Sequence, residues 1–217
     1  MRTTFLSIIA LLFTVPAQAH KIIQIGDSQS HGIFGEYLHE KIRTRTTSDF
    51  TLYSRGGSTV DSWLDYQKLK GRFRIIQPNG NQFLLERDHM TSLKKILSRR
   101  PDTVIIQLGG NMVRQSDEHI QEQVEKITSF VKHYGANCIW IGPPNGWKRP
   151  QQCFSEFYPV LKQAAEAGGC TFVDSRKYTY YPKGRGDGIH YDKIYFGGDL
   201  LVSNWVNHVF RKIKNLL

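Results

Sequence analysis

A chain of 217 residues, 40% of them hydrophobic, is long enough to bury one substantial core, and we expect a single globular domain. Its formal net charge is +10, from 29 basic and 19 acidic residues. The basic residues are dispersed, with short clusters only at 41–45 and 211–214, which is typical of a solvated surface and does not indicate a nucleic-acid partner. Neither a Cys-x-x-Cys nor a His-Glu-x-x-His spacing occurs, so we do not expect a zinc site.

The first 19 residues have the layout of a secretory signal peptide. Arg2 precedes an apolar run over 5–15, and Ala17 and Ala19 occupy the −3 and −1 positions of a cleavage site. The apolar run is shorter than the roughly 20 residues that a membrane-spanning helix needs. We therefore expect cleavage after Ala19, a mature chain of residues 20–217 with no transmembrane span, and a secreted or periplasmic location. For an exported basic protein, anionic glycans, peptidoglycan or a lipid surface are better partners than nucleic acid.

Strand-like apolar runs alternate with amphipathic helical runs, which predicts an α/β fold with a central parallel sheet covered by helices. Helical spacing of apolar residues predicts helices at about 30–43, between the third and fourth strands, and at 201–217. Two apolar-rich runs within 71–87 surround Pro-Asn-Gly-Asn, which predicts a β-hairpin insertion that overhangs the sheet edge. The predicted strands are 21–26, 50–54, 103–110, 138–144 and 171–175.

Three cysteines allow one disulfide in an oxidising compartment. Cys138 lies in the apolar run ANCIWIG, and we expect it to be a buried strand residue. Cys153 and Cys170 flank a predicted helix, and we expect these two to pair.

Polar and glycine residues follow the predicted strands at their carboxyl ends, where open parallel sheets bind ligands. Gly-Asp-Ser (26–28) follows the first strand, Gly-Gly-Ser (56–58) the second and Gly-Gly-Asn (109–111) the third. An Asp-Gly-Ile-His loop (187–190) follows the fifth strand. Together these segments contain the residue types that a serine hydrolase needs.

Each residue type has a chemical reason. Ser28 is a poor nucleophile unless a base takes its proton, and His190 could do so if Asp187 fixes its tautomer and stabilises the imidazolium. The oxyanion of the tetrahedral intermediate needs preorganised donors. The backbone N–H groups of Ser28 and Gly57 and the side-chain amide of Asn111 could supply three.

The segments IGDS (25–28), RGGST (55–59), LGGN (108–111) and DGIH (187–190) resemble the sequence blocks of the SGNH hydrolases, also called GDSL-type esterases and lipases. The resemblance implies a flavodoxin-like three-layer α/β/α sandwich and a reaction without a cofactor or metal. It also implies roles for five residues: Ser28, Asp187 and His190 as the catalytic triad, and Ser28, Gly57 and Asn111 as the oxyanion hole.

Three departures from the family pattern argue against transferring a substrate from a well-known subgroup. The nucleophile block reads GDSQS rather than GDSL, and Met112 follows the asparagine where many members have Asp. The hairpin at 71–87 is not a general family feature. In the second block, Gly57 matches the family's oxyanion glycine better than Gly56.

Aromatic and basic residues near the predicted site suggest a sugar substrate. Trp147, Tyr180 and Tyr181 could stack on a sugar ring, and Lys148 and Arg149 could meet a carboxylate; alternatively, the aromatic residues are packing residues. We expect an esterase that removes small acyl groups, above all acetyl, from a polysaccharide or peptidoglycan. The alternatives are a lysophospholipase or thioesterase, an O-acyltransferase, and a catalytically silent glycan-binding module.

Overall fold

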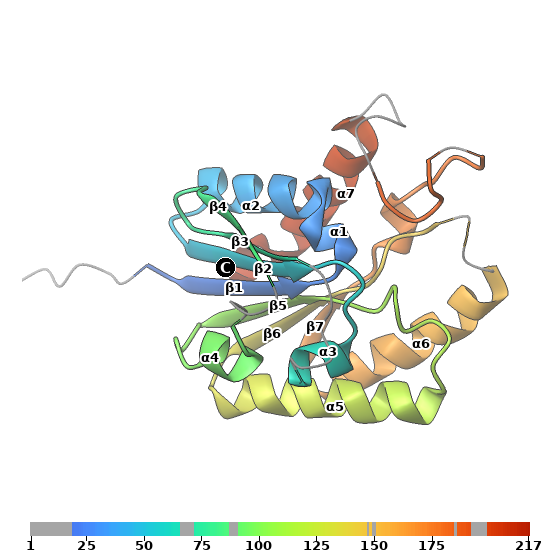
Figure 1. Ribbon diagram of the computed structural model, residues 1–217, viewed down its shortest axis with the longest axis horizontal. Coiled ribbons are helices and arrows are strands. Elements are labelled where there is room, and N and C mark those ends of the chain that lie inside the picture. Colours follow the sequence, from blue (N-terminus) through green and yellow to red (C-terminus); the bar gives the residue numbers. More distant parts are fainter. Residues whose placement is uncertain are drawn as a thin grey trace, which may run out of the picture.

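A computed structural model describes residues 19–65, 72–86, 91–146, 148, 151–184, 186–191 and 199–217 (Figure 1). Among the described residues, no helix is both long and apolar enough to cross a membrane. The predicted signal peptide is residues 1–19, and all of it except Ala19 lies outside the described residues. The described residues form a three-layer α/β/α structure, as the sequence predicts.

The central layer is a seven-stranded sheet with the order β4-β3-β2-β1-β5-β6-β7. Strands β2, β1, β5, β6 and β7 are parallel, and β3 and β4 pair antiparallel at one edge. All five predicted parallel strands are present, although three end earlier than expected. The strands are β1 (Lys21–Gly26), β2 (Asp49–Arg55), β3 (Phe73–Ile76), β4 (Gln82–Leu85), β5 (Thr103–Gln107), β6 (Asn137–Ile141) and β7 (Cys170–Val173).

Helices cover both faces of this sheet (Figure 1). One face carries α1 (Ser28–His31), α2 (Ile33–Arg45) and α7 (Asp199–Ile213). The other face carries α3 (Val60–Leu64), α4 (Leu93–Leu97), α5 (Asp117–His133) and α6 (Gln151–Ala167). Two short 3-10 helices, η3 (Arg176–Tyr178) and η4 (Lys214–Leu216), precede and follow α7.

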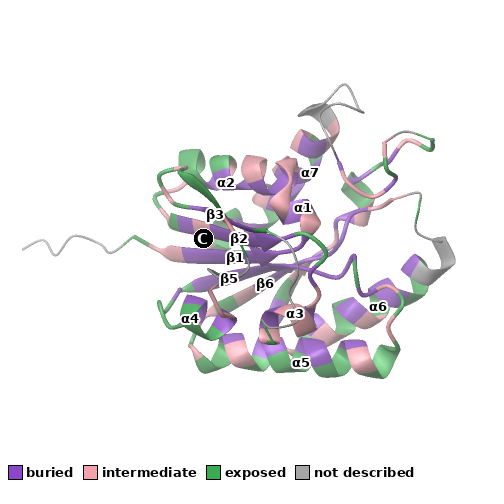
Figure 2. Ribbon diagram, in the orientation of Figure 1, coloured by how far each residue is buried: buried purple, intermediate pink, exposed green. Residues whose placement is uncertain are grey.

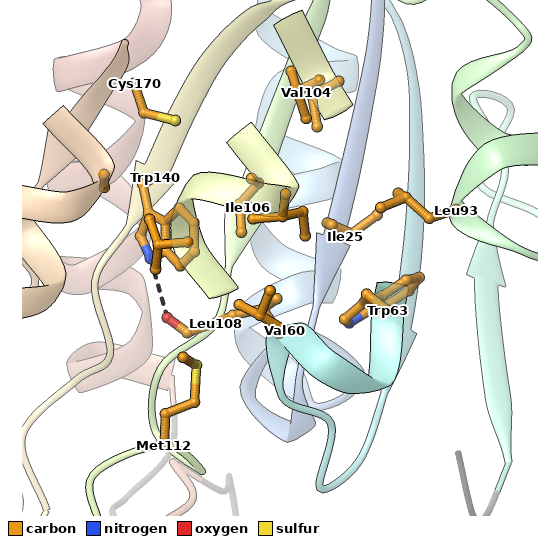
Figure 3. Close-up of a cluster of buried hydrophobic side chains, with 14 of the residues drawn as sticks. Ile25, Val60, Trp63, Leu93, Val104, Ile106, Leu108, Met112, Trp140 and Cys170 are labelled. Atoms are coloured by element: carbon orange, nitrogen blue, oxygen red, sulfur yellow. Dashed lines mark hydrogen bonds between the residues drawn. The ribbon is translucent and has the colours of Figure 1, made fainter. Parts of the chain in front are cut away.

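Each face of the sheet has its own apolar core, and the central strands are buried on both sides (Figure 2). Because β1 and β5 are covered twice, their sequences are nearly continuous apolar runs. Under α2 and α7, the Phe34 ring stacks on the Trp205 ring with centroids 3.7 Å apart. On the opposite face, the buried Trp140 indole donates a hydrogen bond of 3.2 Å to the Leu108 carbonyl (Figure 3).

The helix predicted over 30–43 is divided in two at Gly32. This residue is extended, and its N–H group caps α1 by donating to the carbonyls of Ser28 and Gln29. The helix α2 then packs directly on the backbone of α1. Glycine at position 35 permits this contact, since a Cβ there would lie closer than 3.0 Å to the Ser30 carbonyl. The break leaves the four residues Ser28–His31 as a separate short helix, α1, that begins at Ser28.

The predicted hairpin is confirmed, but it continues the sheet instead of overhanging it. Strand β3 pairs antiparallel with β2, and β4 pairs with β3. Gly80, with φ of +87°, occupies the turn between them, where glycine is favoured. The hairpin thereby adds two strands to the sheet next to β2.

The predicted disulfide between Cys153 and Cys170 is wrong, because Cys170 is bonded to Cys138. These two residues stand opposite each other in the parallel register of β6 and β7, and their Cα atoms are 4.4 Å apart. The bond therefore joins the amino-terminal ends of neighbouring strands, away from the sheet edge that carries the candidate site. Cys138 is a strand residue, as expected, but it is only partly buried.

Candidate active site

Ser28, His190 and Asp187 form a continuous line of contacts beyond the carboxyl ends of the strands. Ser28 is the first residue of α1, directly after Asp27, whose carboxylate caps this helix by accepting the Gln29 N–H at 2.9 Å. The Oγ atom of Ser28 lies 2.8 Å from His190 Nε2. On the other side of the ring, His190 Nδ1 lies 2.5 Å from Asp187 Oδ2. The structure thus brings together the three residues that the sequence predicts as a triad.

The loop around Asp187 keeps its carboxylate ionised. The Oδ1 atom accepts the backbone N–H groups of Ile189 and His190, both at 2.8 Å. Burial pushes the pKa of Asp187 upward, but these hydrogen bonds and the one from the His190 ring outweigh it, so the pKa lies well below its ordinary value. An ionised carboxylate has no proton to give, so His190 Nδ1 must be the donor. In the neutral imidazole, Nε2 is then the acceptor that faces Ser28.

Two buried side chains fasten this loop to the rest of the site. The Gln29 amide donates a hydrogen bond of 2.8 Å to the Ile189 carbonyl, which links α1 to the loop. The Tyr181 hydroxyl accepts the Gly188 N–H at 3.0 Å and lies 3.2 Å from Asp187 Oδ1. Tyr181 is only 6% exposed, so its position fits the packing alternative better than stacking on a sugar.

The candidate oxyanion donors lie on two turns that contact each other. Gly57 is exposed and has a φ of +72°, which favours glycine there. The next residue, Ser58, donates its hydroxyl to the carbonyls of Arg55 and Gly26, at 3.0 and 3.3 Å. The Asn111 amide donates to the Ser58 carbonyl at 3.0 Å. These bonds hold both turns at the same edge as Ser28.

Met112, the departure from the family pattern after Asn111, is a core residue in this chain. Its side chain is fully buried in the core beneath α3 and α5, and its N–H donates to the Gly109 carbonyl at 2.9 Å (Figure 3). The residue therefore anchors the turn that presents Asn111.

The remaining predicted residues lie around the Asp187–His190 loop or outside the described part. Lys148 is exposed, and its backbone N–H donates to the Gly188 carbonyl at 3.3 Å, so the segment after β6 lies against this loop. Tyr180 is 69% exposed. Trp147 and Arg149 lie outside the described residues.

Arg74 is a residue that sequence reasoning missed. It comes from β3 of the hairpin, yet its guanidinium donates to the His31 carbonyl at the end of α1, at 2.5 Å, and to the Glu36 carboxylate of α2, at 2.6 Å. The side chain is only 10% exposed. A charged residue inside the apolar run FRII was the available signal. Through Arg74, the hairpin supports the helix that carries Ser28.

A buried polar cluster lies beneath α1. The Ser30 hydroxyl accepts from the Gln24 side-chain amide and donates to Oε1 of the Gln107 side chain, each at 2.8 Å. The same Gln107 oxygen accepts the Ser30 N–H at 3.2 Å. These bonds connect the short helix to β1 and β5 and so fix its position over the sheet. Among the described residues, no cluster of three His, Cys, Asp or Glu side chains could hold a metal ion.

Neither a protein-family model nor a curated protein matches this sequence. Solved structures do resemble it. An acetylxylan esterase from Geobacillus stearothermophilus aligns with a TM-score of 0.62 at 16% identity, covering 89% of this chain and 94% of that one. A lipase/acylhydrolase from Enterococcus faecalis gives 0.61 at 21% identity, with 91% and 97% covered. TesA gives 0.64 at 18% identity, with 91% and 99% covered. The chain therefore shares the fold of these three proteins over nearly its whole length.

Proposed function

We propose that this protein is a serine ester hydrolase that removes small acyl groups, above all acetyl, from a carbohydrate. The observation that carries the proposal is the line of contacts from Ser28 through His190 to Asp187. It lies at the edge of the sheet where open α/β folds bind their ligands. The similarity in fold to esterases and acylhydrolases supports the same reaction class.

In the proposed reaction, Ser28 Oγ attacks the carbonyl carbon of the ester while His190 Nε2 takes its proton. The tetrahedral oxyanion accepts hydrogen bonds from the N–H groups of Ser28 and Gly57 and from the Asn111 amide. That amide has two hydrogens, so it can donate to Ser58 and to the oxyanion together. The intermediate then expels the alcohol, which takes the proton from His190. Water, with His190 again as base, hydrolyses the acyl-enzyme.

Three observations support a carbohydrate substrate outside the cytoplasm. The first 19 residues have the layout of a signal peptide. The exposed ring of Tyr180 and the charge of Lys148 flank the loop that carries His190 and Asp187, where a sugar ring and an acidic group would find partners. One solved structure of similar fold is an acetylxylan esterase.

The test is an ester series on the purified mature chain. We expect p-nitrophenyl acetate to be hydrolysed faster than the butyrate, octanoate and decanoate, and Ser28→Ala to lose at least ~1,000-fold in turnover. Ser98→Ala, an exposed serine on the opposite face, is the matched control and should retain full activity. Acetylated xylan is the first polymer to assay.

Each other outcome indicates a different function for this protein. Faster turnover of the long-chain esters would replace this proposal with a lysophospholipase or thioesterase. Acyl transfer to a sugar in preference to water would indicate an O-acyltransferase. If the wild type and Ser28→Ala are equally inert although both are folded, the protein is not an esterase, and a glycan-binding module takes its place.

A further inference from the structure

A pocket of about 680 Å³ lies between α2, α7 and the segment of η3 that leads to Tyr180. It belongs to the helical layer of α2 and α7 and does not include Ser28, His190 or Asp187. Its volume is in the usual range for pockets that bind small molecules. The proposed reaction gives this pocket no role.

The pocket is lined by cations from three separate elements. Lys41 comes from α2, Lys177 from η3 and Arg211 from α7, and no carboxylate is among the lining residues. Two nearby carboxylates are neutralised by ion pairs: Glu40 with Arg43, and Asp174 with Arg176. Within the described part of the chain, none of the three lining cations is in an ion pair. The pocket is therefore a site of positive potential.

The buried His208 lies next to the pocket wall and contributes no charge to it. Its ring stacks on that of Tyr178, one of the lining residues. Burial, followed by the charges of Lys212 and Arg211, lowers the pKa of His208 to about 4. The imidazole is consequently neutral at physiological pH, and the positive charge comes from the lysine and arginine side chains.

Aromatic rings and amides complete the lining. Tyr180 is 69% exposed, which is unusual for a ring of this size and leaves it available for stacking. Tyr178 is 42% exposed, although His208 covers one face of its ring. Asn204 and Asn207 lie one turn apart on α7 and add side-chain amides that can bond to hydroxyl groups. Cations alone would suit a phosphate, whereas cations, exposed rings and amides together suit a sugar that carries a carboxylate.

The pocket adjoins the candidate active site along the chain. Tyr180 lines the pocket, and the next residue, Tyr181, bonds to the loop that holds Asp187. Thr179, also a lining residue, accepts the Asn145 N–H at 3.0 Å in the segment that reaches Lys148. The pocket wall is therefore continuous with the segments that contact the loop of Asp187 and His190.

We propose that this pocket binds a carboxylate-bearing sugar, such as a uronic acid residue, of the polysaccharide whose ester is cleaved. The part concerning the ester rests on the proposed function. Binding of the acidic sugar does not, and it can be measured separately.

The test uses Ser28→Ala, in which binding is measured without turnover, and oligosaccharides that carry no ester. By titration calorimetry, trigalacturonate should bind at least about tenfold more tightly than neutral xylotriose, and added salt should weaken it. Lys177→Gln/Arg211→Gln should weaken trigalacturonate binding by about tenfold, since two exposed charge contacts are lost. The control Lys94→Gln/Lys95→Gln removes the same charge from α4, on the opposite face, and should change neither affinity nor ester turnover.

Equal weakening by the two double variants would overturn the proposal, because binding would then follow net charge alone. Equal affinity for the acidic and the neutral trisaccharide, or binding of neither, would overturn it as well. Failure of the proposed function has different signatures: ester turnover that survives Ser28→Ala, or a folded wild type that hydrolyses no ester. Selective trigalacturonate binding in that event would leave the pocket as a site without the reaction.

Discussion

Gly26, the last residue of β1, has no room for a side chain. A Cβ there would lie closer than 3.0 Å to both Cβ and Oγ of Ser30, a distance that real Cβ atoms essentially never show. Ser30 cannot swing aside, because its hydroxyl is bonded to Gln24 and Gln107. The Gly26→Ala substitution must therefore displace α1. Overpacking of this kind costs about 1–3 kcal/mol of unfolding free energy. A displacement of about 1 Å would also separate Ser28 from His190 and, on the proposed mechanism, lower ester turnover by about 100-fold.

Urea unfolding followed by circular dichroism measures the first effect, and p-nitrophenyl acetate turnover the second. Ser30→Gly removes both atoms that clash, so the double variant Gly26→Ala/Ser30→Gly tests the cause. Ser30→Gly alone destabilises the protein, because it leaves two buried amides with fewer partners. If the clash is real, the double variant is at least ~1 kcal/mol more stable than the sum of the single effects implies. Strict additivity, or wild-type behaviour of Gly26→Ala, would refute the reasoning.

Three further predictions concern separate parts of the molecule. Asn111→Ala should lower ester turnover by about 100–1,000-fold with little effect on the KM for p-nitrophenyl acetate, as expected when an oxyanion donor is lost. An unchanged turnover would show that Asn111 is not part of the site. Replacing Cys138 and Cys170 by serine should lower the free energy of unfolding by about 2–4 kcal/mol in urea titrations, since the bond closes a loop of 32 residues, while turnover of the folded protein is retained. The unfolding free energy should decrease as the pH is lowered from 6.5 to about 4, because His208 binds a proton in the unfolded chain over this range but not in the folded protein. His208→Asn should flatten this dependence, and an unaltered slope would contradict the assignment.

The strands, and the sheet edge that carries the candidate site, could be predicted from the sequence for one physical reason. A strand covered on both faces is apolar along most of its length, as in KIIQIG of β1 and TVIIQ of β5, so the runs mark where the strands lie. Parallel strands deliver their carboxyl ends to one edge of the sheet. Residues that directly follow such runs, including Ser28 and Asn111, must therefore gather there.

The features that could not be predicted depend on distances between elements. Cys138 and Cys170 pair because of the register of β6 and β7, which their spacing in the chain does not reveal. The division of the first helix at Gly32 follows from the close packing of α2 on α1, which involves Gly35. The contact of Arg74 with α1 requires the hairpin to join the sheet, and its strand pattern alone does not say against which strand it lies.

The hydrogen bond between Ser28 and His190 spans 162 positions of the chain. Its serine follows β1, the strand at the centre of the sheet, whereas its histidine comes after the edge strand β7 in the chain. Contacts of such long range close late, because the chain between them must be ordered first. On the proposed mechanism, a chain that has not yet packed its last quarter carries a serine without a base. Recovery of ester hydrolysis during refolding would then report completion of the fold, and it should lag behind the return of helical signal.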